Sequence, residues 1–423
     1  MKSLSLNSIC VAGLLALLAM PVGLAGQEES ATQEQKPNPT HYTIQDLGIV
    51  GTNFYQPGQP FVISSNGWVS GGAGVGTDYG PPEHAVLWHG GSMIDIGNPG
   101  LGGNSIAYGV NEWGHAVGEA EDTSSGLSTT EDFCGFQFMG YTFTPTPCVP
   151  FVWKYGKMVR LKTLGGANGV ANEISSYGVI AGYAENTTVD STCPTGGPQV
   201  YQFKPVTWNG SWIQPLATAG QNAEGVAFDD PDGVANSVND KGQVVGSTGT
   251  CTAFNAIFLF NLQPVHAVLW QNGKALDLGG LPGESNYLAE YINNRGEVVG
   301  GSATEAFLWT AEKGMQGLGH VGTDNFSLGI GINDKGEIVG ISGDSPAFTI
   351  IRAVVRQHGT LVDLNTLIVG SNPFPAGGLI TNPFGDYPTG LVTACKINSK
   401  GEITGIAVDK DGFTHAYLAI PTN

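Results

Sequence analysis

The stretch NDKGEIVG spans Asn333–Gly340, and NNRGEVVG spans Asn293–Gly300. The shared pattern is Asn or Ser, two residues, Gly, three residues and Gly, and it occurs seven times. Its first four residues are typical of a type I turn, in which the Asn or Ser side chain hydrogen-bonds within the turn and the glycine takes a positive φ. Each copy predicts a β-hairpin with a three-residue loop and a bulge glycine. The copies begin at Ser64, Asn111, Ser175, Asn239, Asn293, Asn333 and Asn398.

The second glycine of each copy falls inside the strand that follows the turn. A glycine inside a strand usually marks close packing by another backbone or by a bulky ring. We therefore assign the Asn and Gly residues of the repeat to structure. On this basis Asn333→Ala should cost about 1 kcal/mol, the value of one turn hydrogen bond. The second glycines are Gly71, Gly118, Gly182, Gly246, Gly300, Gly340 and Gly405.

A second repeat alternates with the first. Each hairpin copy is followed by a strand-like run such as HAVLW at His84 or EAFLW at Glu305, and most of these runs lead into a further run such as ALDLGG at Ala275. One unit thus contains four short strands, and the second glycines recur on average about every 56 residues. A four-stranded unit at this period is typical of a propeller blade with insertions. The sequence predicts an all-β, seven-bladed β-propeller.

The two ends of the chain complete the count of strands. The last unit stops after FTHAYLAI, its third strand, whereas the N-terminal YTIQDLG at residues 42–48 is a fourth strand without a unit. We expect this strand to complete blade 7, because joining the two ends removes an open sheet edge.

The alternation of HAVLW, EAFLW and HAYLA with NDKGEIVG-type hairpins resembles the bacterial extracellular HAF repeat family, over residues 41–423. The copy RAVVR departs from the pattern, because Arg356 replaces the tryptophan. The resemblance implies an exported repeat protein and brings no catalytic residues with it.

Residues 1–26 have the basic start, apolar run and small residues of a secretory signal peptide, and residues 27–40 have the composition of a flexible tether. We expect a secreted or periplasmic protein whose propeller spans residues 41–423 and which does not insert into a membrane. The formal net charge of −19 argues against nucleic acid as a partner. We expect a monomer.

Repeated polar and aromatic columns have a structural explanation. His84, His266 and His415 occupy equivalent positions in different blades, so they cannot meet at one metal ion. The tryptophans that end the same runs suit packing between blades.

Known catalytic motifs for zinc proteases, serine hydrolases and phosphate binding are missing from the sequence. Propeller enzymes that act on carbohydrates can use acidic residues at the central channel, and the innermost strands contain Glu173 and Glu290. Neither has a visible partner, so we interpret both as solvated carboxylates at strand ends. A lyase or glycosidase at the channel remains the alternative function.

The blades differ most in the loops between their second and third strands. These loops are long in blades 2, 3 and 4, at residues 119–148, 183–203 and 247–265, but short in blade 5, at 301–304. Long insertions on one rim of a rigid scaffold usually carry recognition. We therefore predict a non-catalytic binding protein for an extracellular glycan or protein. The candidate ligand-binding aromatic residues, which could equally form a local core, are Phe136, Phe138, Tyr141, Phe143, Phe254 and Phe258.

Asp229, Asp230 and Asp232 lie close together in one acidic loop, which suggests Ca²⁺ as the only cofactor to consider. This loop lacks the distal glutamate of a standard calcium loop.

The cysteines predict how the long loops are held. For an exported chain, we predict disulfides Cys134–Cys148 within blade 2 and Cys193–Cys251 between blades 3 and 4, with Cys395 as a buried free thiol.

Overall fold

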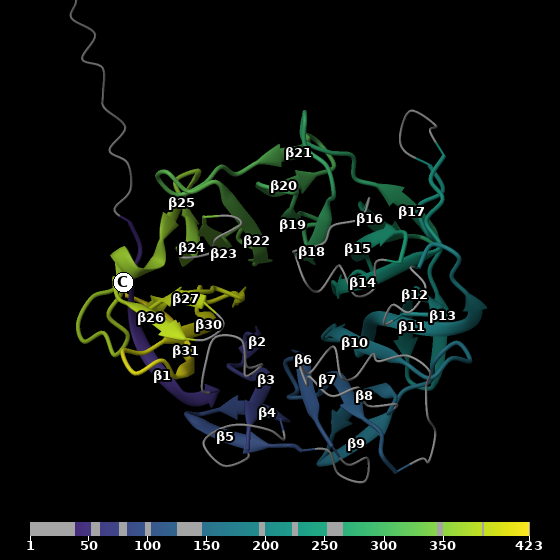
Figure 1. Ribbon diagram of the computed structural model, residues 1–423, viewed down its shortest axis with the longest axis horizontal. Helices are drawn as coiled ribbons and strands as arrows, with labels where there is room; N and C mark the ends of the chain where they lie inside the picture. Colours follow the sequence, from purple (N-terminus) through teal and green to yellow (C-terminus); the bar gives the residue numbers. More distant parts are fainter. Residues whose placement is uncertain are drawn as a thin grey trace, which may run out of the picture. The chain divides into compact units, whose positions relative to one another are not determined.

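The computed structural model describes residues 39–51, 60–75, 83–97, 103–124, 146–193, 199–221, 227–251, 265–344, 350–382 and 385–422. Residues 39–423 form one compact unit in which seven antiparallel blades surround a central channel (Figure 1). The predicted signal peptide lies outside the described residues, as does nearly all of the predicted tether. The seven-bladed propeller is confirmed.

The first three blades follow the predicted order of strands from the channel outward. Blade 1 contains β2 (Pro60–Ile63), β3 (Val69–Gly74), β4 (Glu83–His89) and β5 (Ser92–Asp95). Blade 2 contains β6 (Ser105–Val110), β7 (Ala116–Glu121), β8 (Cys148–Lys154) and β9 (Lys157–Arg160). Blade 3 contains β10 (Gly169–Ile174), β11 (Val179–Val189), β12 (Tyr201–Asn209) and β13 (Trp212–Pro215).

The next three blades repeat this arrangement. Blade 4 contains β14 (Asp232–Val238), β15 (Val244–Gly249), β16 (Val265–Gln271) and β17 (Lys274–Asp277). Blade 5 contains β18 (Leu288–Ile292), β19 (Val298–Gly301), β20 (Ala306–Thr310) and β21 (Gly314–Gly317). Blade 6 contains β22 (Phe326–Ile332), β23 (Ile338–Gly343), β24 (Ile351–Gln357) and β25 (Thr360–Asp363).

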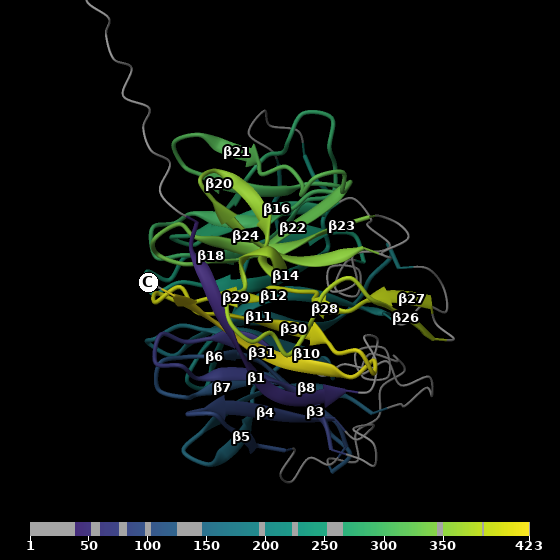
Figure 2. The ribbon, with the colours of Figure 1, turned by 90° about the vertical axis from the view of Figure 1, so that its left-hand side faces the viewer.

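Blade 7 is built from both ends of the chain, as predicted. Its C-terminal part supplies β28 (Gly390–Leu391), β29 (Lys396–Ile397), β30 (Ile403–Val408) and β31 (Thr414–Thr422), and β1 (His41–Gly51) pairs with β31 (Figure 2). A separate hairpin, β26 (Leu379–Asn382) and β27 (Gly385–Pro388), lies between blades 6 and 7 in the sequence. The one helical turn in the described ranges is Leu364–Leu367. Within these ranges no helix is long and apolar enough to cross a membrane.

The hairpin turns have the predicted geometry. In all seven, the amide of the first glycine donates to the carbonyl of the first residue, as in Gly336 N to Asn333 O at 3.0 Å. Gly336 has a φ of 85°, and the glycines at this position in the other copies are also positive.

The tryptophans that end the third strands connect neighbouring blades, in agreement with the prediction that they pack between blades. The indole N–H groups donate to backbone carbonyls in, or just after, the outermost strand of the preceding blade. Trp88 donates to Leu47 O at 3.1 Å, Trp208 to Lys162 O at 2.8 Å and Trp270 to Ala217 O at 2.6 Å. Each buried ring thus pairs its one polar atom at a blade interface.

The three equivalent histidines each contact an aspartate of another segment. His84 contacts Asp95, His266 contacts Asp230 and His415 contacts Asp46, at distances of 3.0, 2.8 and 3.0 Å. Each histidine therefore ties its strand to another segment, and the three lie in separate blades, as expected.

The clasp between β31 and β1 depends on pH through His415. Burial lowers the pKa of His415, but hydrogen bonds and charges from Asp46 and Asp409 outweigh burial and raise it above 6.5. A group whose pKa is raised by folding stabilises fully below its unfolded pKa and loses that contribution as pH rises through its folded pKa. We therefore expect wild type to lose stability relative to His415→Asn between about pH 6 and 8, measured by urea unfolding. A pH-independent difference between the two proteins would contradict this role.

Candidate functional site

The innermost strands turn polar side chains toward the central channel at regular β-bulges. The register of the innermost strand shifts between Ala171 and Glu173 in blade 3 and between Ala289 and Tyr291 in blade 5. Blades 1, 2, 4 and 6 have a shift at the equivalent place, and in blade 7 the innermost strand is divided into β28 and β29. A bulge re-aims side chains that a regular strand would direct toward the neighbouring blades. The ionisable side chains it positions in blades 3, 5 and 7 are Glu173, Glu290, Tyr291 and Lys396.

Lys396 is the centre of this cluster. Its Nζ donates to the carbonyl of Ile330 at 3.2 Å and lies 3.3 Å from the centroid of the Tyr291 ring. Burial lowers the pKa of Lys396 to about 8, although the charges of Glu173 and Glu290 act in the opposite direction. The ammonium group of this half-buried lysine thus contacts a carbonyl and a ring, and the charges of two carboxylates act on it.

The pKa values of Glu173 and Glu290 are raised, whereas that of Lys396 is lowered. Burial raises the pKa of Glu173 to about 7, opposed by the Lys396 charge and by hydrogen bonds from the Ile174 amide, at 3.0 Å, and from Tyr291. Burial also raises the pKa of Glu290 to about 7, opposed by the charge of Lys396, although the residue is only half-buried. The interpretation as a solvated carboxylate without a partner is wrong for Glu173, which is buried and accepts the Ile174 amide. Glu290 is half-buried, and both glutamates are near enough to Lys396 for its charge to lower their pKa values.

Two carboxyl groups that titrate near neutrality beside an amine are able to exchange protons at physiological pH. Sequence reasoning missed Lys396 and Tyr291 as members of this cluster. The available signal was the lysine in TACKIN, a charged residue at a position where the other innermost strands have mainly small or apolar residues.

The channel opens on the face of the hairpin turns into a polar cavity of about 130 Å³. Residues of all seven blades line it, including Glu173 and Tyr291. The Asn side chains of the turns encircle the cavity, because each Nδ2 donates to the carbonyl of the equivalent residue in the next blade. The donors and acceptors are Asn111 and Ser175, Asn239 and Asn293, Asn293 and Asn333, Asn333 and Asn398, and Asn398 and Ser64.

Carboxylates at this mouth also accept hydrogen bonds from the neighbouring blade. Glu112, Asp240 and Asp334 accept the backbone amides of Ser65, Ser176 and Asn294 of the preceding blade, at 2.9, 2.8 and 2.7 Å. The mouth is therefore a closed polar ring in which turn residues join one blade to the next.

Asn333 contributes more to this ring than the sequence indicated. Its Oδ1 accepts the amides of Lys335 and Glu337, and its Nδ2 donates to Glu337 Oε2 and Asn398 O. We now expect Asn333→Ala to destabilise the protein by about 2 kcal/mol, since several bonds of about 1 kcal/mol each are lost. Urea unfolding measures the effect.

The matched control is Asn333→Ser, since Ser64 and Ser175 occupy the same turn position elsewhere. Their hydroxyls accept the amides of Trp68 and Val179, both at 3.1 Å, which preserves the turn. Asn333→Ser should therefore cost less than Asn333→Ala, because it keeps the bond from the Glu337 amide and loses the Nδ2 bonds to Glu337 and to blade 7. Equal costs for the two variants would argue against a contribution from the inter-blade bond.

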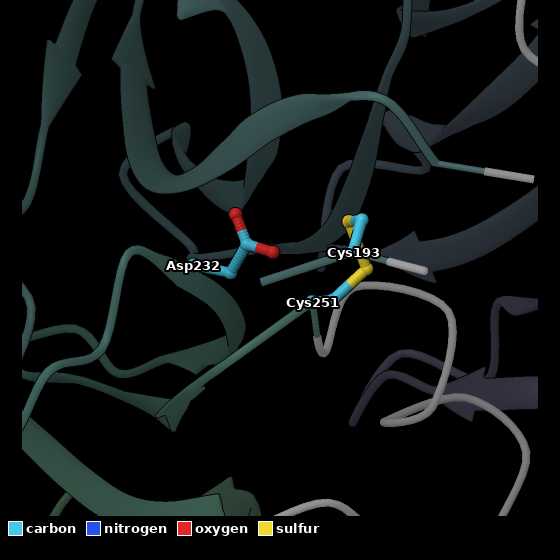
Figure 3. Close-up of side chains that lie close together, drawn as sticks. All are labelled: Cys193, Asp232 and Cys251. Atoms are coloured by element: carbon cyan, nitrogen blue, oxygen red, sulfur yellow. A yellow bond between two sulfur atoms is a disulfide. The ribbon is translucent and has the colours of Figure 1, made fainter. Parts of the chain in front are cut away.

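The base of the predicted recognition rim is held by a disulfide. Cys193, which follows β11, is bonded to Cys251, which follows β15, with a Cα–Cα distance of 5.2 Å (Figure 3). The predicted link between blades 3 and 4 is confirmed, and so is Cys395 as a buried free thiol. Cys148 is also disulfide-bonded, and its predicted partner Cys134 lies outside the described residues.

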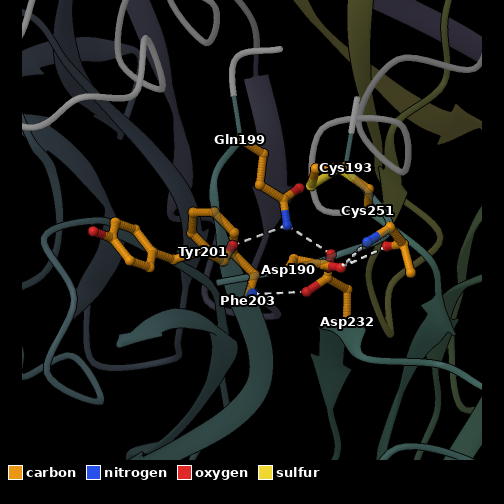
Figure 4. The surroundings of a disulfide bond; sticks show 8 residues. Asp190, Cys193, Gln199, Tyr201, Phe203, Asp232 and Cys251 are labelled. Atoms are coloured by element: carbon orange, nitrogen blue, oxygen red, sulfur yellow. Dashed lines mark hydrogen bonds between the residues drawn. A yellow bond between two sulfur atoms is a disulfide. The ribbon is translucent and has the colours of Figure 1, made fainter. Parts of the chain in front are cut away.

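A buried polar network lies beside this disulfide. Asp232 accepts the Phe203 amide at 2.9 Å and the Gln199 side chain at 2.6 Å (Figure 4). Burial raises the pKa of Asp232 to about 8, reinforced by a hydrogen bond and charge from Asp190. The nearby Lys204, whose pKa is lowered by burial, donates to the carbonyl of Pro231 and attracts both aspartates.

The three aspartates of the candidate calcium loop do not converge on one another in their hydrogen bonds. Asp229 is exposed, Asp230 binds Thr248 and His266, and Asp232 belongs to the network with Asp190. Cys193, Asp232 and Cys251 have ligand atoms within 4.8 Å of one another, but both sulfurs are in the disulfide. Calcium at Asp229, Asp230 and Asp232 stays a prediction.

The aromatic candidates for ligand binding are Phe136, Phe138, Tyr141, Phe143, Phe254 and Phe258, and all lie outside the described residues.

No protein-family model matches the chain, and no curated protein matches it. Solved structures with a similar fold include a gluconolactonase from Xanthomonas campestris, at 12% identity and a TM-score of 0.36, with 73% of this chain and 92% of that chain covered. An acylaminoacyl peptidase from Pyrococcus horikoshii matches at 10% identity and a TM-score of 0.44, with 89% of this chain and 54% of that chain covered. A protein of unknown function from Dyadobacter fermentans matches at 11% identity and a TM-score of 0.36, with 89% of this chain and 98% of that chain covered. Such distant matches carry no argument about activity.

Proposed function

We propose that this chain is an exported, monomeric, non-catalytic binding protein of the HAF repeat type. The rim of blades 2 to 4 would be its recognition face, and an extracellular glycan or protein its partner. The observation that carries the proposal is the covalent link between blades 3 and 4, where Cys193–Cys251 joins the two long loops at their base. Fixing the base of a long loop lowers the ordering cost that the loop would otherwise incur on binding.

The polar network supports the same role. Asp190 accepts the amide and hydroxyl of Thr192 at 2.7 and 2.6 Å, two residues before the disulfide. Gln199 links the other end of this segment to the Tyr201 carbonyl and to Asp232. Both ends of the blade 3 loop are therefore anchored on blades 3 and 4, which suits a loop that presents a preformed surface.

Binding of the purified mature chain to arrays of extracellular glycans and secreted proteins tests the proposal. Cys193→Ser with Cys251→Ser should weaken binding of the captured ligand while the propeller stays folded, because the rim loses its link. Glu173→Gln should bind as wild type does. Loss of binding in Glu173→Gln with full binding in the double serine variant would reject the rim and favour the channel.

The channel cluster favours a second candidate function, a lyase or glycosidase. Glu173 and Glu290, each with a pKa raised to about 7 beside Lys396, have the protonation behaviour that an acid–base pair needs. Release of reducing or unsaturated ends from a polysaccharide panel would establish this function. The activity should fall at least about 100-fold in Glu173→Gln, the typical contribution of a general acid or base. Equal release by wild type and Glu173→Gln would exclude the channel.

A further inference from the structure

Most buried carboxylates among the described residues either have a positive charge beside them or accept hydrogen bonds that satisfy them. Glu173 and Glu290 share Lys396 in the channel, and Asp190 and Asp232 share Lys204 at the rim base. One further pair, Glu83 of blade 1 and Glu119 of blade 2, has no Lys, Arg or His interacting with it anywhere in the described part of the chain. This pair is the exception that the established features of the fold leave unexplained.

Glu83 lies at the start of β4, and its side chain extends over a glycine toward blade 2. The carboxylate occupies the space beside Gly72, where a Cβ would meet Glu83 Oε1 at 2.2 Å and Ile106 Cγ1 of blade 2 at 2.9 Å. Glu83 is only 5% exposed. Neither of its carboxylate oxygens has a hydrogen-bond partner within the described residues.

Glu119 approaches the same interface from blade 2. It is the cross-strand partner of Ile106, whose side chain lies with that of Glu83 beside Gly72, and it is 0% exposed. Its Oε1 accepts the Tyr108 hydroxyl at 2.7 Å, whereas its Oε2 has no partner in the part of the chain that the structure describes. Three buried carboxylate oxygens of this pair therefore lie near one blade interface with no donor among the described residues.

Other buried glutamates show how this fold satisfies such groups. Glu121 accepts the backbone amide and the side-chain amide of Asn104, at 3.0 and 3.1 Å. Glu185 accepts the same two groups of Asn168, at 2.9 and 2.7 Å. An isolated buried carboxylate is strongly unfavourable unless it is paired, hydrogen-bonded, bound to a metal or neutralised by a proton. Burial raises the pKa of Glu119 to about 8, so without a cation this carboxyl group would take up a proton near neutral pH. Among the described residues, Glu83 and Oε2 of Glu119 have neither of the first two solutions, which leaves a cation or a proton.

We propose that Glu83 and Glu119 together bind one divalent cation between blades 1 and 2, with Ca²⁺ as the matching class. Carboxylate oxygens are hard ligands that suit Ca²⁺, Mg²⁺ or Mn²⁺ rather than softer ions. Two carboxylates and a divalent cation leave no net charge in the buried interface. Burial and mutual repulsion raise the pKa of Glu83, which agrees with a site that lacks its positive charge. The site is separate from the loop of Asp229, Asp230 and Asp232.

The experiment measures Ca²⁺ bound per chain by the mature protein after dialysis, using isothermal titration with CaCl₂ and metal analysis. Wild type should bind one Ca²⁺ that is lost in Glu83→Gln and in Glu119→Gln, two variants of nearly unchanged side-chain size. Asp229→Asn is the control for the acidic loop and should retain that ion. Wild type should also gain thermal stability as Ca²⁺ increases, by mass action, and both Gln variants should not.

A second readout does not depend on affinity for calcium. Tyr108 donates to Glu119, so Tb³⁺ bound at this site should emit on excitation of tyrosine, and the Gln variants should lose that emission. If wild type binds no Ca²⁺ and no Tb³⁺ at this interface, or if Asp229→Asn removes the ion and Glu83→Gln retains it, the proposal is overturned. Should Glu83→Gln not fold, Glu119→Gln and the terbium signal of wild type decide in the same way.

Discussion

Gly300→Ala is expected to destabilise the propeller by about 3 kcal/mol or more, since overpacking a closely packed site typically costs about 1–3 kcal/mol and occasionally more. A Cβ on Gly300 would lie 1.8 Å from the carbonyl oxygen of Leu288 and 2.8 Å from Cζ of Phe307. The first contact is with the backbone of the innermost strand at its bulge, so relief requires movement of the strand pair. Urea unfolding of the mature chain measures the loss.

The control for Gly300 is Gly220→Ala. Nothing lies within 4 Å of a Cβ at Gly220, so this substitution should leave stability within about 0.5 kcal/mol of wild type. Equal urea midpoints for Gly300→Ala and Gly220→Ala would show that the backbone at the bulge moves freely to accommodate a methyl group, which would contradict this prediction. The same approach to a carbonyl, at 1.8–2.0 Å, occurs at the second glycine of six repeats: Gly118, Gly182, Gly246, Gly300, Gly340 and Gly405.

Lys396→Met should also be strongly destabilising, by about 3–5 kcal/mol at pH 8, because removing one partner of a buried ionic group leaves the others uncompensated. The variant keeps the length of the side chain and its contact with Tyr291 but deletes the charge that holds Glu173 and Glu290. Urea unfolding between pH 5 and pH 8 measures both the size of the effect and its pH dependence.

The pH dependence has a defined sign. The pKa values of Glu173 and Glu290 are already raised to about 7, and loss of Lys396 removes the influence that lowers them. An acid whose pKa is raised by folding favours the folded state at low pH and loses that contribution as pH rises through the folded pKa. The defect of Lys396→Met should therefore be smaller at pH 5 than at pH 8.

Two further variants separate charge from packing at Lys396. Adding Glu173→Gln and Glu290→Gln to Lys396→Met should restore a large part of the lost stability at pH 8, since no buried charge then remains without a partner. Lys410→Met, at a fully exposed lysine, should leave the unfolding midpoint unchanged. A defect that persists in the triple variant and does not change with pH would assign Lys396 a packing role alone.

The sequence by itself determined the architecture, because the physics that specifies it is local and repeated. The turn in NDKGEIVG depends on one Asn side chain and one glycine within five residues, and seven copies made the number of blades countable. The completion of blade 7 by residues 42–48 followed from a missing strand at one end and an extra strand at the other. The disulfide between Cys193 and Cys251 followed in the same way, from the expectation of export and from long loops in neighbouring blades.

Only the tertiary structure decided which side chains meet. Lys396 is far from Glu173 and Glu290 in the sequence, and a bulge of one residue in each innermost strand sets whether a side chain faces the channel or a neighbouring blade. Glu83 and Glu119 likewise have no pattern around them in the sequence that marks them, and the fold buries both. Burial and the proximity of charges depend on the closed ring of blades, and neither has a short-range signal in the chain.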